Sequence, residues 1–261
     1  MYFECLSSSW HKYKIYNLDI IKYKYKLIYN YNIAMTETTI TTISNIEGYY
    51  INLKARTDRK LHVEHQLDLI GIRHNVKRFN AVHNVNGRIG CSLSHLKCIQ
   101  MAKEQNMECV LILEDDVSFL LPDDFLQNVN KFLSNPKNQW DVLLLAGNNL
   151  PPFTTNDEVS IRVTHCQTTT GYIVRKHYYD TLIANIKEGV AKLMKNPENH
   201  YFFSIDKYWI NLQKQHRWML LIPLIVVQRP DYSDIEKRYT DYQRLMTSVD
   251  KSYIRASKSS E

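Results

Sequence analysis

The sequence predicts an α/β protein whose mostly parallel sheet is covered by helices on both faces. Short apolar segments recur along the chain, as in strands buried on both faces, and segments with helical spacing separate them. Strands that alternate with helices form such a sheet because each helix returns the chain to the same edge. A chain of 261 residues with 44% hydrophobic and 23% charged residues can bury a sizeable core, and this composition excludes a disordered or fibrous protein.

The first half of the chain carries six predicted elements. Thr57 or Asp58 can cap the first helix, and Leu93, Leu96 and Ile99 recur at three-residue steps in the second. In chain order the elements are a strand at 48–53, a helix to 69, a strand at 75–80, a helix at 89–105, a buried strand at 110–113 and a helix from 122.

The second half carries fewer clear signals. Two β-rich runs, 159–164 and 170–174, suggest a hairpin-like pair. The other predicted elements are a buried strand at 140–147, a helix at 177–194, a helical patch at 205–213 and a last strand at 220–227.

Composition divides the chain into three parts. Residues 1–34 are biased to Tyr, Lys, Ile and Asn and show no period, so we interpret 1–46 as a poorly ordered leader, 47–235 as the domain and 236–261 as a C-terminal tail. Five lysines and two acids give the first 34 residues +3 of the net charge of +6. The rest is nearly balanced, which favours a small anionic substrate and argues against a nucleic acid partner.

The five cysteines are scattered, odd in number and without C-x₂-C spacing. They indicate a reducing, cytoplasmic compartment rather than a disulfide framework or a zinc site. The lysine-containing N-terminal stretch makes a poor signal peptide. The longest apolar run, 218–227, is about half of the ~20 residues that a spanning helix needs. We therefore expect no integral membrane segment.

Three acids, Glu114, Asp115 and Asp116, directly follow the buried strand at 110–113. If the chain stays extended there, Glu114 and Asp116 point to one side and Asp115 to the other. Carboxylates at the mouth of a sheet suit Mg²⁺ or Mn²⁺, which takes diphosphate oxygens as further ligands. The same three acids also fit a solvated turn before the next helix.

Four ordered sequence pieces resemble the glycosyltransferase family 25 domain, which is found in lipooligosaccharide and collagen hydroxylysine galactosyltransferases. Weaker similarities are Ser204-Ile-Asp206 and Pro223 followed by Ser233-Asp-Ile235, so the resemblance covers about residues 48–235. The four pieces are Ile51-Asn-Leu-Lys-Ala-Arg-Thr-Asp-Arg59, Gly90-Cys-Ser-Leu-Ser-His95, Leu111-Ile-Leu-Glu-Asp-Asp-Val117 and Thr170-Gly-Tyr-Ile-Val174.

The resemblance implies a GT-A-like fold, a nucleotide-sugar donor and inversion at the anomeric carbon. It implies that Glu114, Asp115 and Asp116 hold Mn²⁺ or Mg²⁺ against the donor diphosphate. For Arg56 a solvated cap on the first helix fits equally well, and for Lys54 and Arg59 that interpretation is favoured. The positions implied for binding the donor are Asn52, Leu53, Arg56, Ser94, His95, Thr170 and Gly171.

Inverting transfer needs a base that takes the proton of the acceptor hydroxyl. The candidates are Asp206, Asp116, Asp141 and His177, and we predict Asp206 and Asp116 as the catalytic residues. Asp206 lies where the family has a P-x-D piece, although Ser204 replaces the proline. It equally fits a third metal ligand or a helix N-cap.

The leading prediction is therefore an enzyme that moves galactose or glucose from a UDP-sugar to a hydroxyl of a glycan or protein acceptor. A metal-dependent nucleotidyltransferase or phosphodiesterase is a second hypothesis, although the sequence has no P-loop. A third is a non-catalytic domain that keeps the fold and binds a glycan or a protein.

Overall fold

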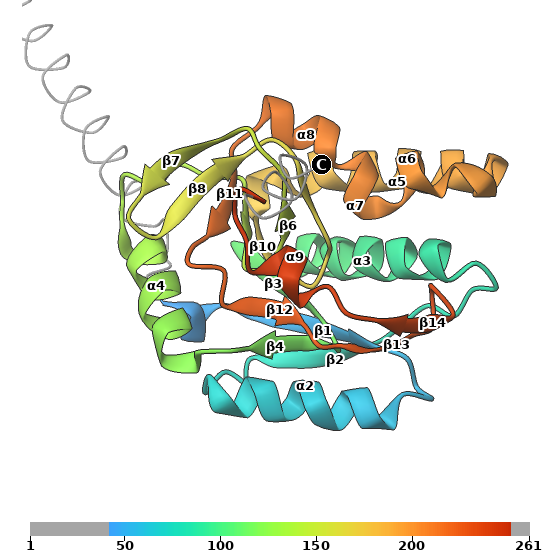
Figure 1. The fold of residues 1–261 in the computed structure, drawn as a ribbon, viewed down its shortest axis with the longest axis horizontal. Helices are drawn as coiled ribbons and strands as arrows, with labels where there is room; N and C mark the ends of the chain where they lie inside the picture. The colour runs from blue at the N-terminus through green and yellow to red at the C-terminus, as the bar shows by residue number, and fades with distance from the viewer. Residues whose placement is uncertain (1–41, 252–261) are drawn as a thin grey trace, which may run out of the picture. The chain divides into compact units, whose positions relative to one another are not determined.

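A central eight-stranded sheet organises residues 42–251, the part of the chain that the computed structural model describes (Figure 1). β10 and β8 run opposite to the other six strands, so the sheet is mixed but mostly of one direction. This sheet and its flanking helices confirm the predicted α/β class. The strand order is β2 (Val76–Asn80), β1 (Gly48–Asn52), β3 (Cys109–Glu114), β10 (Gly171–Arg175), β5 (Val142–Leu144), β11 (Trp218–Leu221), β8 (Ser160–Val163) and β7 (Phe153–Asp157).

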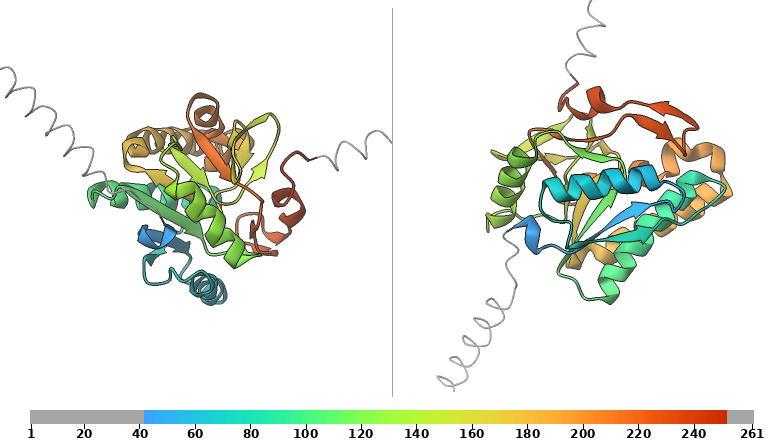
Figure 2. Two further views of the ribbon diagram at one scale, coloured as in Figure 1. Left: turned by 90° about the vertical axis from the view of Figure 1, so that its left-hand side faces the viewer. Right: turned by 90° about the horizontal axis from the view of Figure 1, so that it is seen from below.

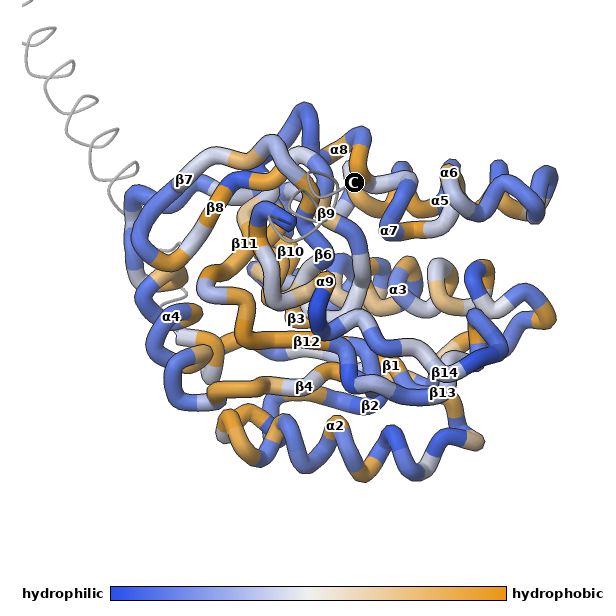
Figure 3. Tube along the Cα trace, viewed as in Figure 1, coloured by the Kyte–Doolittle hydropathy of each residue, from blue (hydrophilic) through white to orange (hydrophobic). Residues whose placement is uncertain are grey.

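Helices cover both faces of the sheet. One apolar cluster contains residues of α2 (Thr57–Leu69) and α4 (Pro122–Ser134), and the other contains residues of α3 (Gly87–Glu104) and α5 (Tyr179–Lys195). Figure 1 shows α2 and α3 on opposite sides of β1, and Figure 2 shows α2 crossing the strands when seen from below. The hydropathy colouring in Figure 3 places apolar residues along the central strands between these layers.

β3 lies at the centre of this packing, with β1 on one side and β10 on the other. Leu111 and Leu113 belong to the cluster of α2 and α4, whereas Val110 and Ile112 belong to that of α3 and α5. Because both faces of the strand are buried, its sequence is a continuous apolar run. A Cβ added at Gly48 of β1 would lie 2.3 Å from the carbonyl oxygen of Leu111, so glycine allows the close approach of the two strands.

Two predictions about strands were wrong. The runs at 159–164 and 170–174 do not pair with each other, because β8 pairs with β7 and β11, while β10 inserts between β3 and β5. The last strand, predicted over 220–227, divides into β11 and β12 (Val226–Gln228). Pro223 lies between them, and its missing N–H cannot continue a strand ladder.

Short elements complete the described residues. β12 pairs with β4 (Val117–Phe119) directly after the acidic residues, and β13 (Asp231–Ser233) forms a hairpin with β14 (Arg238–Thr240). The rest are η1 (Ile43–Asn45), β6 (Asn148–Asn149), β9 (Cys166–Gln167), η2 (Lys176–Tyr178), η3 (Pro197–Asn199), α6 (His200–Phe203), α7 (Ile205–Tyr208), α8 (Ile210–Gln215) and α9 (Gln243–Met246).

The division into leader, domain and tail stays a prediction. Residues 1–41 and 252–261 lie outside the described residues. Within the described part, Ile43 and Ile46 of the predicted leader are buried in the core, and so is Met246 of the predicted tail. The boundary predicted at 235 falls inside the β13–β14 hairpin.

Candidate active site

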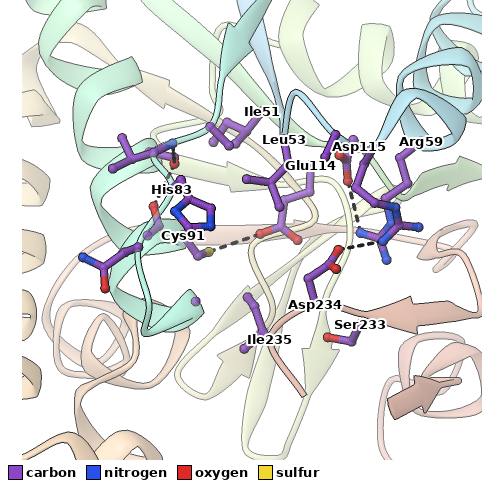
Figure 4. Close-up of a pocket in the computed structure, with 18 of the residues that line it drawn as sticks. Ile51, Leu53, Arg59, His83, Cys91, Glu114, Asp115, Ser233, Asp234 and Ile235 are labelled. Carbon is purple, nitrogen blue, oxygen red and sulfur yellow. Dashed lines mark hydrogen bonds and ion pairs between the residues drawn. The ribbon is translucent and has the colours of Figure 1, made fainter. Parts of the chain in front are cut away.

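A cavity of about 520 Å³ opens where β1 and β3 end (Figure 4). In open α/β sheets, ligands bind beyond the carboxyl ends of the parallel strands, and this cavity lies there. Its walls come from the segment after β1, the segment between β2 and α3, the start of α3, the acidic residues after β3 and the β13–β14 hairpin. Leu53, Arg56, Ser94, His95 and all three acids of residues 114–116 are among its lining residues.

The three acids do not alternate as an extended chain would place them. β3 ends at Glu114 and the chain turns at Asp115 and Asp116, so these two side chains face the same partner and Glu114 faces another. Asp115 accepts a hydrogen bond of 2.7 Å from Nδ2 of Asn52. Asn52 is itself fixed by Arg78, which donates to its side-chain oxygen at 2.9 Å. The predicted donor-binding residue Asn52 therefore holds the acidic turn in place.

Arg59 is the partner that Asp115 and Asp116 share. Its guanidinium lies 3.1 Å from Oδ1 of Asp115 and 3.0 Å from Oδ2 of Asp116. It also reaches Asp231 in the hairpin at 3.1 Å and the carbonyl of Tyr232. The interpretation of Arg59 as a solvated helix cap was wrong, because its side chain is only 11% exposed and lines the cavity.

One positive charge does not balance the acidic turn. Burial and the neighbouring Glu114 charge raise the pKa of Asp116 to about 7, although Arg59 opposes this rise. Burial likewise raises the pKa of Asp115. Oδ2 of Asp116 accepts from Gln228 at 2.9 Å, but its buried Oδ1 has no hydrogen-bond partner among residues 42–251. The site therefore has an excess of negative charge and one unused carboxylate oxygen.

Glu114 turns to a different set of neighbours. Its Oε1 accepts from Thr169 at 2.6 Å and lies 3.2 Å from Nε2 of His95 and 3.7 Å from Sγ of Cys91. Burial favours a higher pKa for Glu114, but the hydrogen bond and charge of His95 outweigh it and the pKa is lowered. His95 is fully buried, and its Nδ1 lies 2.8 Å from the hydroxyl of Tyr172.

The helix that carries His95 starts earlier than the sequence predicts. α3 begins at Gly87, and the side chain of Asn86 caps it by accepting from the amide of Arg88. Ser94 therefore lies two turns into the helix, where its hydroxyl donates to the carbonyl of Gly90 and accepts from the amide of Val82. These bonds fix the segment that forms one wall of the cavity.

Arg56 lines the cavity but is already paired with acids. Its guanidinium lies 2.8 Å from Asp58, 2.9 Å from Asp231 and 2.7 Å from Asp234. Together with Arg59, it ties the β13–β14 hairpin to the segment after β1. Figure 4 shows Asp234 and Ile235 of the hairpin facing the acidic residues across the cavity.

The remaining predicted residues lie behind or beside the cavity wall. Thr170 and Gly171 are fully buried, and the carbonyl of Thr170 accepts from the amide of Glu114 at 2.9 Å. The side chain that reaches Glu114 from this loop is the neighbouring Thr169. Asp206, in α7, accepts from the amide of Thr168 at 3.3 Å and lies 3.6 Å from Nζ of Lys207.

Asp141 and His177 form a separate cluster. Asp141 lies 2.8 Å from Nε2 of His177 and 3.0 Å from the guanidinium of Arg217, and these partners lower its pKa against the effect of burial. Neither residue lines the cavity. The cluster lies where β5 begins and β10 ends, at the edge of the sheet away from the cavity.

Three residues that the sequence analysis did not single out also contact the site. Asp231, Gln228 and Thr169 contact the acidic residues or their arginine from segments more than 50 residues away. Gln228 and Asp231 lie between Pro223 and Ser233, in a stretch that carries no part of the resemblance, and Thr169 directly precedes the piece that starts at Thr170. No helix within the described residues is long and apolar enough to cross a membrane.

The sequence model of glycosyltransferase family 25 (LPS biosynthesis protein) matches residues 85–192, which confirms the predicted family resemblance. The matched segment contains α3, β3 with the acidic turn, and β10. A search of curated protein sequences finds no match.

A search of solved structures finds matches of low sequence identity. A mannose-1-phosphate geranyltransferase from Thermus thermophilus is 9% identical, covers 67% of this chain and 73% of its own, and has a TM-score of 0.41. A glycosyltransferase involved in glycosylation of the major capsid of PBCV-1 is 14% identical over 68% and 92%, with a TM-score of 0.36. Drosophila β1,4-galactosyltransferase 7 in complex with manganese, UDP-Gal and xylobiose is 11% identical over 77% and 74%, with a TM-score of 0.33.

Proposed function

We propose that this protein is an inverting, metal-dependent glycosyltransferase that moves galactose or glucose from a UDP-sugar to a hydroxyl of a glycan or protein. The proposal rests on one observation. The acidic turn, whose negative charge Arg59 does not fully balance, lies in the same cavity as Arg56 and Arg59. A cavity of about 520 Å³ is within the range of sites for ligands of this size. Cationic and acidic groups side by side suit a metal–diphosphate ligand.

The residues present fit a hard divalent cation. Asp116 offers a buried oxygen without a partner among the described residues, and burial and the neighbouring Glu114 charge raise its pKa. Oxygen donors of this kind are the ligands that Mn²⁺ and Mg²⁺ prefer. Asp115, Asp116 and Glu114 would hold the ion, which when bound stabilises the charge that grows on the leaving diphosphate.

The chain's own residues then bind and orient the donor. We assign Arg56 and Arg59 to the diphosphate. Phosphate oxygens accept hydrogen bonds from a guanidinium in much the same geometry as carboxylate oxygens do, so they can take the place of the present acidic partners. We assign Leu53, which lines the same side of the cavity as Arg56, to the nucleotide. His95, held by Tyr172 and Glu114, faces the sugar.

In inverting transfer, the acceptor oxygen bonds to the anomeric carbon while the bond from that carbon to the diphosphate breaks on the opposite side. A base must take the acceptor's proton. We propose Asp206, with Asp116 as the alternative. The charge of Asp206 is near enough to Cys91, a lining residue of the cavity, to help raise the pKa of its thiol, after burial and Glu114, which supports this choice.

A donor screen tests this proposal. Purified protein with Mn²⁺ and a panel of nucleotide sugars should release UDP from one UDP-hexose, and chelation should abolish the release. Asp116→Ala should lower transfer by roughly 100-fold or more, as loss of transition-state charge stabilisation does. Asp124→Ala, an exposed acid on α4, is the control and should keep full activity. Transfer that is indifferent to chelator and to Asp116→Ala would contradict the metal role.

One observation favours the non-catalytic alternative. Arg59 already neutralises part of the acidic turn without any ligand, so the turn can be a structural ion-pair cluster. A binding domain predicts thermal stabilisation by a glycan and no turnover with any UDP-sugar. Stabilisation by UDP and Mn²⁺ together would instead favour the transferase.

A further inference from the structure

Cys91, His95 and Glu114 bring three different metal-ligating atoms together at the inner end of the cavity. Cys91 and His95 are one turn apart on the same face of α3, and Glu114 is the last residue of β3. The sulfur, the imidazole nitrogen and the carboxylate oxygen all lie within 4.8 Å of one another. Figure 4 shows the Cys91 and Glu114 side chains pointing toward each other.

Two of the three separations match the edges of a tetrahedral zinc site. With Zn–S of about 2.3 Å and Zn–N or Zn–O of about 2.0–2.1 Å, tetrahedral angles put sulfur about 3.6 Å from oxygen and nitrogen about 3.3 Å from oxygen. In the structure, Sγ of Cys91 lies 3.7 Å from Oε1 of Glu114, and Nε2 of His95 lies 3.2 Å from it. The carboxylate oxygen of Glu114 is therefore already spaced from the sulfur and the nitrogen as in such a site.

Neighbouring residues hold two of the ligands in position. The hydroxyl of Tyr172, fully buried in β10, lies 2.8 Å from Nδ1 of His95, which orients the ring with Nε2 toward the cluster. Thr169 donates to Glu114 at 2.6 Å. Metal-binding histidines and carboxylates commonly have such supporting hydrogen bonds.

Charge and proton balance are also satisfied. Binding of a divalent cation releases the thiol proton of Cys91 and any proton on Nε2 of His95, while Nδ1 keeps its proton, which the Tyr172 oxygen accepts. A thiolate and a carboxylate then neutralise the two charges of the ion. All three ligand residues line the cavity, which leaves a fourth coordination position for water or a ligand.

The donor set differs in kind from the acidic turn. Sulfur and imidazole ligands select Zn²⁺ or Co²⁺, whereas the oxygens of Asp115 and Asp116 suit Mn²⁺ and Mg²⁺. We propose that Cys91, His95 and Glu114 form a second, zinc-selective cation site, and that Zn²⁺ bound there inhibits the enzyme by withdrawing Glu114 and His95 from the donor site. The ligand assignment is independent of the proposed function, and only the inhibition rests on it.

Titration with Co²⁺ tests the site directly. The protein should show a near-ultraviolet thiolate-to-cobalt charge-transfer band, which Zn²⁺ should abolish by displacing Co²⁺. Cys91→Ala and Cys91→Ser should both remove the band. Cys98→Ala, which removes a fully buried thiol two turns further along α3, is the matched control and should keep it.

The second arm measures inhibition. Zn²⁺ at micromolar concentration should reduce Mn²⁺-supported transfer by about tenfold or more, and Cys91→Ser should transfer normally but resist Zn²⁺. Absence of the cobalt band in the parent protein, or its persistence in both folded Cys91 variants, overturns the site. If the band behaves as expected but no sugar donor is turned over, the site stands and the proposed function fails.

Discussion

Replacing Asp116 by asparagine should make the metal-free protein more stable at neutral pH while it removes a proposed metal ligand. Asp116 is 2% exposed, and its charge is opposed by burial and by the nearby Glu114 and Asp115 carboxylates. An asparagine oxygen can still accept from Arg59 and Gln228, as Oδ2 of Asp116 does. The substitution removes the unbalanced charge and keeps the hydrogen bonds.

The size of the effect follows from the pKa. Burial raises the pKa of Asp116 from 3.8 to about 7, so the folded protein binds more protons than the unfolded chain between these values. Stability therefore falls as pH rises through this window and levels off above it. Because a tenfold change in proton affinity is worth about 1.4 kcal/mol, the parent loses up to roughly 4 kcal/mol between about pH 4 and pH 8, and the asparagine variant does not.

Urea denaturation with chelator at four pH values between the two limits measures the difference. The free energy of unfolding of Asp116→Asn relative to the parent should rise steadily with pH. Asp231→Asn is the control, because hydrogen bonds from Arg229 and the charge of Arg59 lower the pKa of Asp231 against the effect of burial. Its stabilising contribution is complete above about pH 4, so that variant should show a constant deficit at higher pH. A flat difference for Asp116→Asn would refute the reasoning.

Three further substitutions test the packing around the site, each by urea denaturation. Arg59→Leu should lower the free energy of unfolding by about 3–5 kcal/mol, because it leaves the buried carboxylates of Asp115 and Asp116 without their cation. A loss below about 1 kcal/mol would mean that these ion pairs are exposed to water. Gly48→Ala should cost roughly 1–3 kcal/mol, since the new Cβ would lie 2.3 Å from a carbonyl oxygen of β3; an unchanged midpoint would contradict that close approach. Ser94→Ala should cost about 1–2 kcal/mol by leaving the Val82 amide unpaired, whereas Ser92→Ala, which loses only a bond to its own helix, should cost less.

The central elements of the fold could be predicted because their signals are local. The apolar run of β3 and the spacing of α3 each report burial within a single segment. The position of β10 could not be predicted, since an antiparallel strand inserted between β3 and β5 depends on pairing across the whole chain. The β13–β14 hairpin has no apolar alternation and depends on arginines in another segment for its place.

The sequence predicted the acidic residues of the candidate site and their place at the end of a strand. It did not predict which side chains pair with them. The sequence places Glu114, Asp115 and Asp116 at the end of a strand, and the structure keeps them at one cavity. Their separation into two groups depends on where the strand ends and on Arg59, whose role follows from contacts with residues 115, 116 and 231. A charged residue in the first turn of a helix is usually exposed, so local pattern assigns it to solvent.

The place of β1 in the sheet has a practical consequence for making fragments of this protein. The segment that matches the family, residues 85–192, omits β1 and β2 on one side and β11 on the other. A recombinant piece cut to those limits would uncover the long edge of β3, a run of buried aliphatic residues with free backbone amides, and such an edge recruits strands from other molecules. That piece should precipitate when expressed, whereas a piece that starts before Gly48 keeps the edge paired.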